Sequence, residues 1–263
     1  MKYGIGAARF GEDFEEAFRL AGKIGFDGLE IPFNRVEDHE TELIWSSEGV
    51  AALRGWAERY GIEMPSCVAG RYNHRGFADE DPHVREEAVT LMLHLIDTCA
   101  EAGIRKILTP FFGSQMLDSE ERIGRGIDGV RRCAPRAESR GISLALEGTV
   151  DAGTWLRMIE AIDSESVGVY YDVGNATRYG LDGPAELRML AAEGVLELIH
   201  IKDMTLDHQN MPLGEGDVDW GAVAEAINEI DYDNYLVLET PLREKPREDY
   251  GAWLEFIRSR IGT

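Results

Sequence analysis

The chain has 263 residues, of which 44% are apolar, and this allows one or two domains with a sizeable core. Its formal net charge of −22 repels nucleic-acid phosphates and anionic membrane surfaces, so we expect neither as a partner. No apolar run approaches the roughly 20 residues that span a bilayer, and the first residues lack the apolar segment of a secretion signal. We therefore expect a cytoplasmic protein.

Short apolar segments alternate with longer amphipathic ones along the whole chain. The apolar segments are near-continuous, as is typical of parallel strands buried on both faces. We predict eight strands: Tyr3–Gly6, Gly28–Ile31, Glu63–Val68, Lys106–Pro110, Ser143–Glu147, Gly168–Asp172, Glu197–Ile201 and Tyr235–Glu239.

The segments between these strands show the 3.6-residue spacing of amphipathic helices. The longest spans His83–Ala102, and the last spans Arg247–Ile261. Several end in a glycine just before the next strand, which is a typical helix stop. These glycines are Gly25, Gly61, Gly103 and Gly141.

The repeated order of strand and helix predicts an α/β fold, a single (β/α)8 barrel that occupies residues 1–263 as one domain. An open doubly wound sheet is the alternative, but no G-x-G-x-x-G turn follows an early strand. The long loops follow strands rather than helices. This arrangement places them at the C-terminal face of the barrel, where such folds carry their active sites.

Four acidic or imidazole side chains lie at or near the ends of consecutive apolar strands: Glu147, Asp172, His200 and Glu239. Taken singly, each has a simpler explanation, since Asp172 could cap a helix and His200 could be a hydrogen-bonded core histidine. As a set they converge at the barrel mouth, where a shared cation would relieve the cost of burying several carboxylates.

The chemistry of this set suits a hard or borderline divalent ion. We predict one such ion, with Mn²⁺ preferred and Mg²⁺, Co²⁺ or Zn²⁺ as alternatives. The three cysteines are widely spaced and form no C-x-x-C pair, so neither a structural zinc site nor a disulfide framework is indicated.

Several segments resemble the xylose-isomerase-like superfamily of barrel enzymes, which includes sugar-phosphate isomerases and epimerases. The resemblance extends over nearly the whole chain and implies a (β/α)8 barrel whose single metal is held by the four residues above. The matching segments are Gly25–Glu30, Leu146–Glu147, Tyr171–Asn175, His200–Asp203, Leu213–Trp220 and Leu238–Thr240.

The chain is similar in layout to the ketose 3-epimerases of this superfamily, in which the two metal-binding glutamates also move protons. The resemblance therefore implies that Glu147 and Glu239 are catalytic. The metal would polarise a sugar carbonyl, one carboxylate would remove a proton from the adjacent carbon to give an enediolate, and the other would return a proton. Return to the opposite face gives epimerisation, and return to the neighbouring carbon gives aldose–ketose isomerisation.

We expect a small carbohydrate as the substrate, with or without a phosphate. Asn175 stands where the epimerases carry a histidine, and the arginine that follows their metal-binding histidine is missing. Asn175, Lys202 and Asp203 are candidates for the substrate contacts, although Lys202 could equally form an ion pair with Asp203 or Glu239. His74, in the loop after the third strand, is either a substrate ligand or an ordinary exposed residue.

The leading interpretation is a metal-dependent sugar or sugar-phosphate isomerase or epimerase. The alternative is a metal-dependent dehydratase or other lyase that acts on an inosose or a related keto-polyol, with Lys202 as its acid. The abasic-site nuclease of the same superfamily is disfavoured, because it needs more histidine ligands and this chain has six histidines and a charge of −22. The intact ligand set disfavours a scaffold with a vestigial site. Members of this superfamily often form dimers or tetramers, so the resemblance is compatible with a homodimer or homotetramer of this chain.

Overall fold

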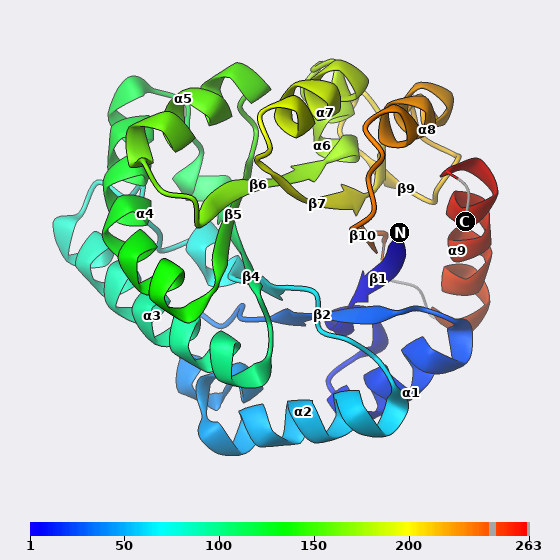
Figure 1. Ribbon diagram of the computed structural model, residues 1–263, viewed down its shortest axis with the longest axis horizontal. Helices are drawn as coiled ribbons and strands as arrows, with labels where there is room; N and C mark the ends of the chain where they lie inside the picture. Colours follow the sequence, from blue (N-terminus) through cyan, green and yellow to red (C-terminus); the bar gives the residue numbers. More distant parts are fainter. Residues whose placement is uncertain (242–245, 262–263) are drawn as a thin grey trace. The chain divides into compact units, whose positions relative to one another are not determined.

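The computed structural model describes residues 1–241 and 246–261. Its parallel strands form a closed barrel in the order β1-β10-β7-β6-β5-β4-β3-β2, which confirms the predicted (β/α)8 fold (Figure 1). The barrel strands are β1 (Lys2–Gly6), β2 (Gly28–Pro32), β3 (Cys67–Val68), β4 (Lys106–Phe111), β5 (Ser143–Gly148), β6 (Val167–Asp172), β7 (Leu196–Ile201) and β10 (Tyr235–Leu238).

Helices alternate with these strands along the chain. The glycines predicted to stop helices all adopt a positive φ, which a residue without a side chain accepts most readily. The helices are α1 (Phe14–Ile24), α2 (Ser47–Tyr60), α3 (Pro82–Ala102), α4 (Glu120–Arg140), α5 (Ala152–Ile162), α6 (Val173–Arg178), α7 (Gly183–Ala192), α8 (Trp220–Glu229) and α9 (Pro246–Ile261). Among the described residues, none of the helices combines the length and apolar character needed to cross a bilayer.

Short elements occupy several loops that follow strands. They are the 3-10 helices η1 (Ala7–Phe10), η2 (His39–Thr41), η3 (Leu43–Trp45), η4 (Gly70–Asn73) and η5 (Gly113–Gln115), and the antiparallel pair β8 (Asp203–Met204) and β9 (Asn210–Met211). Sequence periodicity predicted none of these elements, because each is too short to show a period.

The chain divides into two compact units, and we describe each by itself. The terminal unit comprises Met1–Glu30, Ala57–Glu63 and the described part of Tyr170–Thr263. The central unit comprises Ile31–Trp56 and Met64–Val169. The single-domain expectation for residues 1–263 stays a prediction.

In the terminal unit, β1 pairs with both β10 and the first part of β2, and β10 pairs with β7. The register aligns Ile5 with Leu238, and Leu238 with Ile201. It also aligns Gly6 with Glu30. Glu30 is therefore level with Gly6, and Glu239, one residue beyond Leu238, lies at the same level. His200 is level with Val237, two residues before Glu239.

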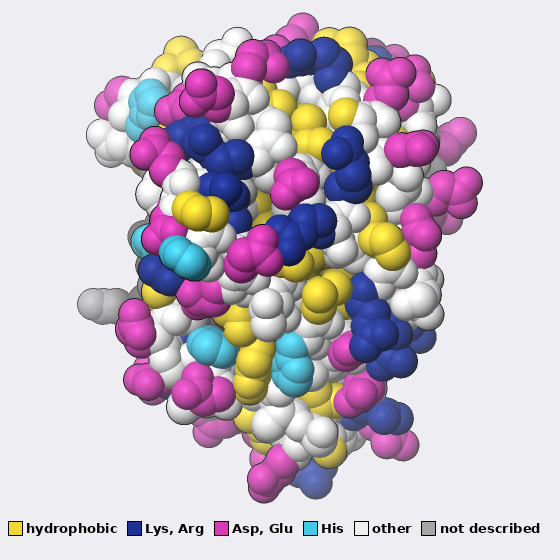
Figure 2. Space-filling model, turned by 90° about the vertical axis from the view of Figure 1, so that its left-hand side faces the viewer, with side chains coloured by type: hydrophobic (Ala, Val, Ile, Leu, Met, Phe, Trp, Pro, Cys, Tyr) yellow, Lys and Arg dark blue, Asp and Glu magenta, His cyan; other side chains and the backbone are white. Residues whose placement is uncertain are grey.

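In the central unit, α3 and α4 pack against each other outside the strands. Ion pairs join their outer faces, as between Arg132 and Glu86 at 2.7 Å and between Arg136 and Asp97 at 2.6 Å. Figure 2 faces the side of the molecule that carries these helices and shows basic and acidic side chains interspersed. This face is a solvated helical surface with no single-sign charge patch.

The predicted third strand, Glu63–Val68, is longer than the observed β3. Only Cys67 and Val68 form the strand, while Glu63 makes an isolated bridge to Gly28. Pro65 lies between them and has no amide hydrogen to donate, so the ladder is interrupted there. The other predicted strands differ from the observed ones by one residue at an end.

Candidate active site

Asp172 is the last residue of β6 and is buried. One of its oxygens, Oδ1, accepts hydrogen bonds from the backbone N–H groups of Gly174 at 2.8 Å and Asn175 at 2.9 Å. Asp172 therefore does cap the short helix α6, as one of the two sequence interpretations expected. Capping uses one carboxylate oxygen, and the other lies 3.6 Å from Lys202 Nζ.

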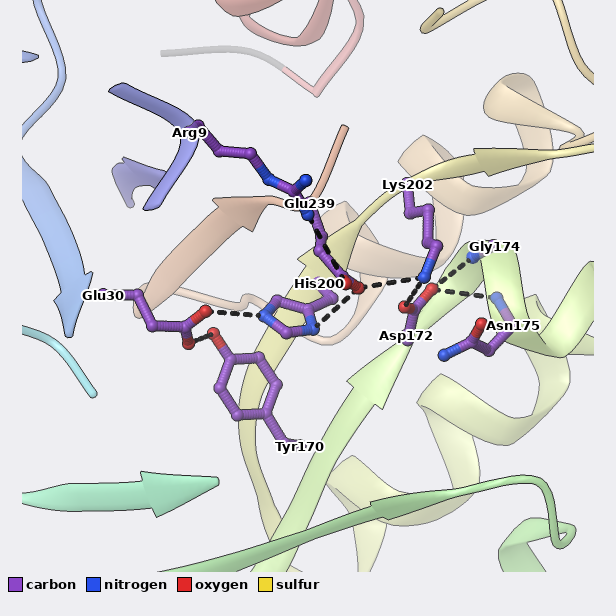
Figure 3. Close-up of polar contacts among 9 residues, drawn as sticks. All are labelled: Arg9, Glu30, Tyr170, Asp172, Gly174, Asn175, His200, Lys202 and Glu239. Atoms are coloured by element: carbon purple, nitrogen blue, oxygen red, sulfur yellow. Dashed lines mark hydrogen bonds and ion pairs between the residues drawn. The ribbon is translucent and has the colours of Figure 1, made fainter. Parts of the chain in front are cut away.

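His200 lies late in β7 with both ring nitrogens directed at carboxylates (Figure 3). Its Nδ1 is 3.6 Å from Oε2 of Glu239, and its Nε2 is 3.2 Å from Oε2 of Glu30. The ring of Tyr170 packs against the imidazole with centroids 4.2 Å apart, and the Tyr170 hydroxyl donates to Oε1 of Glu30 at 2.8 Å. The imidazole is thus held in one orientation inside the barrel.

Glu239 follows β10 directly, and its backbone N–H donates to the carbonyl of Ile201 at 3.0 Å. Its carboxylate lies 3.0 Å from Lys202 Nζ and 3.6 Å from Arg9 Nη2. Burial alone would raise the pKa of Glu239, but the charges of Lys202, His200 and Arg9 outweigh burial and lower its pKa to about 2. Glu239 is therefore an anion at neutral pH.

Ligand atoms from Asp172, His200 and Glu239 lie within 4.8 Å of one another, and Glu147 is the fourth member of this group. Glu147 is buried in β5 of the central unit, in register with Pro110 of β4. Three carboxylates and one imidazole form a donor set for a hard or borderline divalent cation. The residues present therefore fit such an ion.

The model of the xylose isomerase-like TIM barrel family matches residues 18–260 of the chain. The chain belongs to this family. A curated relative, the L-ribulose-5-phosphate 3-epimerase UlaE of Escherichia coli, is 24% identical over 95% of this chain and 91% of its own length. The putative L-ribulose-5-phosphate 3-epimerase SgbU of Escherichia coli is 27% identical over 93% of this chain and 88% of its own length.

Solved structures agree on the fold of this xylose isomerase-like barrel. The D-psicose 3-epimerase of Clostridium cellulolyticum, solved with D-tagatose, superposes with a TM-score of 0.82 at 20% identity and full coverage of both chains. The 3-keto-D-glucoside 4-epimerase YcjR of Escherichia coli gives a TM-score of 0.79 at 19% identity, over 98% of this chain and 99% of its own.

Lys202 of the xylose isomerase-like barrel forms one of the two ion pairs that the sequence left open. Its Nζ donates to Oε2 of Glu239 at 3.0 Å and lies 3.6 Å from Oδ2 of Asp172. The ammonium group thus contacts two members of the ligand group. A substrate contact by Lys202 stays a prediction.

Asp203 is completely buried and has a structural role that the sequence did not predict. Its carboxylate accepts hydrogen bonds from the backbone N–H groups of Gly214, Gly216 and Val218 and from the indole Nε1 of Trp220, at 2.7 to 3.3 Å. A Cβ at position 216 would lie 2.2 Å from Asp203 Oδ1, which explains the glycine there. These hydrogen bonds engage both carboxylate oxygens, and a substrate contact by Asp203 stays a prediction.

Asn175 and His74, the other predicted substrate residues, have different surroundings. Asn175 is buried in the first turn of α6, and Figure 3 shows its side chain beside Asp172. His74 follows η4 in the central unit and is exposed, in agreement with the simpler of its two interpretations. The substrate roles of both stay predictions.

Three residues that contact the ligand group or its histidine were not predicted from the sequence: Arg9, Glu30 and Tyr170. Glu30 left a signal, because it is a charged residue inside an otherwise apolar strand and is only 4% exposed. In the sequence, Tyr170 looks like an ordinary aromatic residue of the core. Arg9 looks like a surface arginine in a loop.

Proposed function

We propose that this chain is a divalent-metal-dependent sugar or sugar-phosphate isomerase, and within that class an epimerase that inverts a carbon next to a carbonyl. The observation that carries the proposal is the group of Glu147, Asp172, His200 and Glu239 at strand ends of a xylose isomerase-like barrel. The names of the relatives support it, because UlaE and SgbU carry the name of a ketose phosphate 3-epimerase.

In this proposal, Asp172 and His200 serve only as ligands, whereas Glu147 and Glu239 hold the metal and also move protons. Manganese is the proposed ion. When bound, it supplies a Lewis acid that polarises the substrate carbonyl and makes the adjacent C–H more acidic. One glutamate removes that proton and the other delivers a proton to the opposite face of the same carbon.

Lys202, Asn175 and His74 are the proposed contacts to substrate oxygens. The position of Lys202 supports a contact with the substrate, because its ammonium group lies 3.0 Å from the carboxylate of Glu239, which we propose to be catalytic. A cation there stabilises negative charge that develops on a substrate oxygen during proton abstraction. The cytoplasmic location and the assembly into a dimer or tetramer stay predictions.

The reaction class is tested by NMR in D2O. The Mn²⁺-loaded protein is incubated with ketoses, keto-polyols and their phosphates. Deuterium at C3 with inversion supports the proposal, and deuterium at C1 or C2 indicates aldose–ketose isomerisation. Loss of water from an inosose would replace the proposal with the lyase alternative. A panel that shows neither deuterium exchange nor loss of water would contradict both.

The proton-transfer roles are tested by Glu147→Gln and Glu239→Gln, which keep an oxygen ligand but remove the basic carboxylate. We expect each change to lower turnover by a factor on the order of 10² or more, because positioned acid–base groups contribute that much. Glu160→Gln, at an exposed position of α5, is the matched control and should retain full turnover. Near-normal rates in both active-site variants, at equal bound metal, would refute the assignment.

A further inference from the structure

A buried carboxylate lies behind the metal-ligand group, on the far side of His200. Glu30 belongs to β2, and its side chain is enclosed together with that of His200, at 4% and 3% exposure. Its Oε1 accepts a hydrogen bond from the Tyr170 hydroxyl at 2.8 Å, and its Oε2 lies 3.2 Å from His200 Nε2. Figure 3 shows Glu30 on the opposite side of the imidazole from Glu239.

Hydrogen-bond chemistry fixes which nitrogen of His200 carries the hydrogen. A carboxylate oxygen accepts hydrogen bonds, so the contact between Oε2 of Glu30 and Nε2 of His200 indicates an N–H at Nε2. A histidine binds a metal only as the neutral imidazole, and in that form an N–H at Nε2 leaves the lone pair on Nδ1. Nδ1 is the nitrogen that faces Glu239, at 3.6 Å from its Oε2, within the ligand group.

We propose that Glu30 is a positioning residue that holds His200 in the Nε2–H tautomer and presents Nδ1 to the metal. Tyr170 completes the arrangement in two ways. Its hydroxyl fixes the Glu30 carboxylate, and its ring packs against the imidazole and limits rotation. Carboxylates that orient a metal-binding histidine also make it a better donor, and their loss weakens metal binding by about 10 to 100-fold.

The tautomer is tested in the metal-free protein, so this test does not depend on the proposed function. The protein is labelled with ¹⁵N-histidine, and long-range ¹H–¹⁵N correlations report the hydrogen on each ring nitrogen. The His200 signals are those missing from His200→Gln. At a pH where the imidazole is neutral, we expect a protonated Nε2 and an unprotonated Nδ1. A hydrogen on Nδ1 with none on Nε2 would overturn the proposal.

The second test rests on the proposed metal site and measures Mn²⁺ affinity by calorimetry. We expect Glu30→Ala to weaken Mn²⁺ binding about 10 to 100-fold. Glu30→Gln should retain most of the affinity, because its amide oxygen still accepts from Nε2 and its N–H₂ group can donate to the Tyr170 oxygen. Tyr170→Phe keeps the ring and should weaken binding less than Glu30→Ala.

The barrel supplies a matched control pair. The Tyr235 hydroxyl donates to Glu63 Oε2 at 2.9 Å, next to the start of β10 and away from the ligand residues. Glu63→Ala should therefore leave Mn²⁺ affinity unchanged.

A folded Glu30→Ala variant that binds Mn²⁺ within twofold of the wild type would refute the positioning role. If the wild type itself binds no Mn²⁺, the proposed function fails, and the tautomer measurement still decides the role of Glu30. If Glu30→Ala does not fold, the tautomer measurement on the wild type decides the role of Glu30 in the same way.

Discussion

Asp203 holds the loop between β9 and α8 by accepting hydrogen bonds from three backbone amides and one indole. Removal of its carboxylate would leave several buried donors unsatisfied, each of which costs about 1–3 kcal/mol. We expect Asp203→Ala to lower the free energy of unfolding by at least about 2 kcal/mol, as measured by urea denaturation. If the variant instead keeps its stability and only raises KM, Asp203 is a substrate residue.

Asp207 provides the control for this experiment. It is an exposed carboxylate in the same segment, and it accepts hydrogen bonds from the side chains of Thr205 and Gln209. Asp207→Ala should change stability by no more than about 0.5 kcal/mol, because exposed surface substitutions rarely do more.

At the residue scale, the sequence predicted the ligand group because each ligand lies at or near the end of an apolar strand. That signal depends only on local pattern and on the rule that parallel strands of a barrel end together. Glu30 lies inside its strand, so no local pattern linked it to His200, which is 170 residues away. The role of Asp203 was also hidden, because its hydrogen-bond partners lie 11 to 17 residues further along the chain.

Helix α4 offers a test at the scale of one element, because it contains glycines in contrasting surroundings. A Cβ added at Gly129 would lie 2.4 Å from the ring of Phe77, which is 1% exposed. Alanine is the better helix former by about 1 kcal/mol, but overpacking a buried contact costs about 1–3 kcal/mol. We therefore expect Gly129→Ala to be destabilising in thermal denaturation.

Gly124 on the same helix is exposed, and a Cβ there would meet nothing within 4 Å. Gly124→Ala should stabilise the protein by up to about 1 kcal/mol, since only the helix propensity changes. If the two substitutions shift the midpoint in the same direction, the packing of Phe77 against α4 is not as described.

At the element scale, the long strands and helices followed from periodicity, and the short elements did not. Strand β3 was overestimated because an apolar run was interrupted by Pro65, whose missing N–H breaks the ladder without changing hydropathy. Asp203 is the first residue of β8, which pairs with β9, and hydrogen bonds to residues further along the chain rather than local propensity shape that segment.

At the scale of the whole molecule, buried thiol and phenol groups with raised pKa values make the stability of the fold depend on pH in the alkaline range. Burial raises the pKa of Cys133 from 9.0 to about 12, and burial also raises the pKa values of Tyr171, Tyr72 and Tyr232 above 10.0. In the unfolded chain these groups ionise near their ordinary values. Above about pH 9 the unfolded state therefore loses protons that the folded state keeps, and the free energy of unfolding falls.

We accordingly expect the thermal midpoint, followed by circular dichroism, to be steady between pH 7.5 and 8.5 and to fall progressively towards pH 11. Cys133 should also resist alkylation at pH 8 in the native protein and react once urea unfolds it. A midpoint that is unchanged or higher at pH 11 would contradict the assignment of these buried groups.

The pairing of β1 with β10 joins the first barrel strand in the chain to the last one. Residue 2 pairs with residue 235, so the open edge of β1 emerges long before its partner exists. The central unit, by contrast, comes almost entirely from one stretch of chain. Distant pairings of this kind fold slowly and leave an unpaired strand edge open to other nascent chains. A growing chain that has not yet reached Tyr235 therefore exposes one edge of β1 without its native partner.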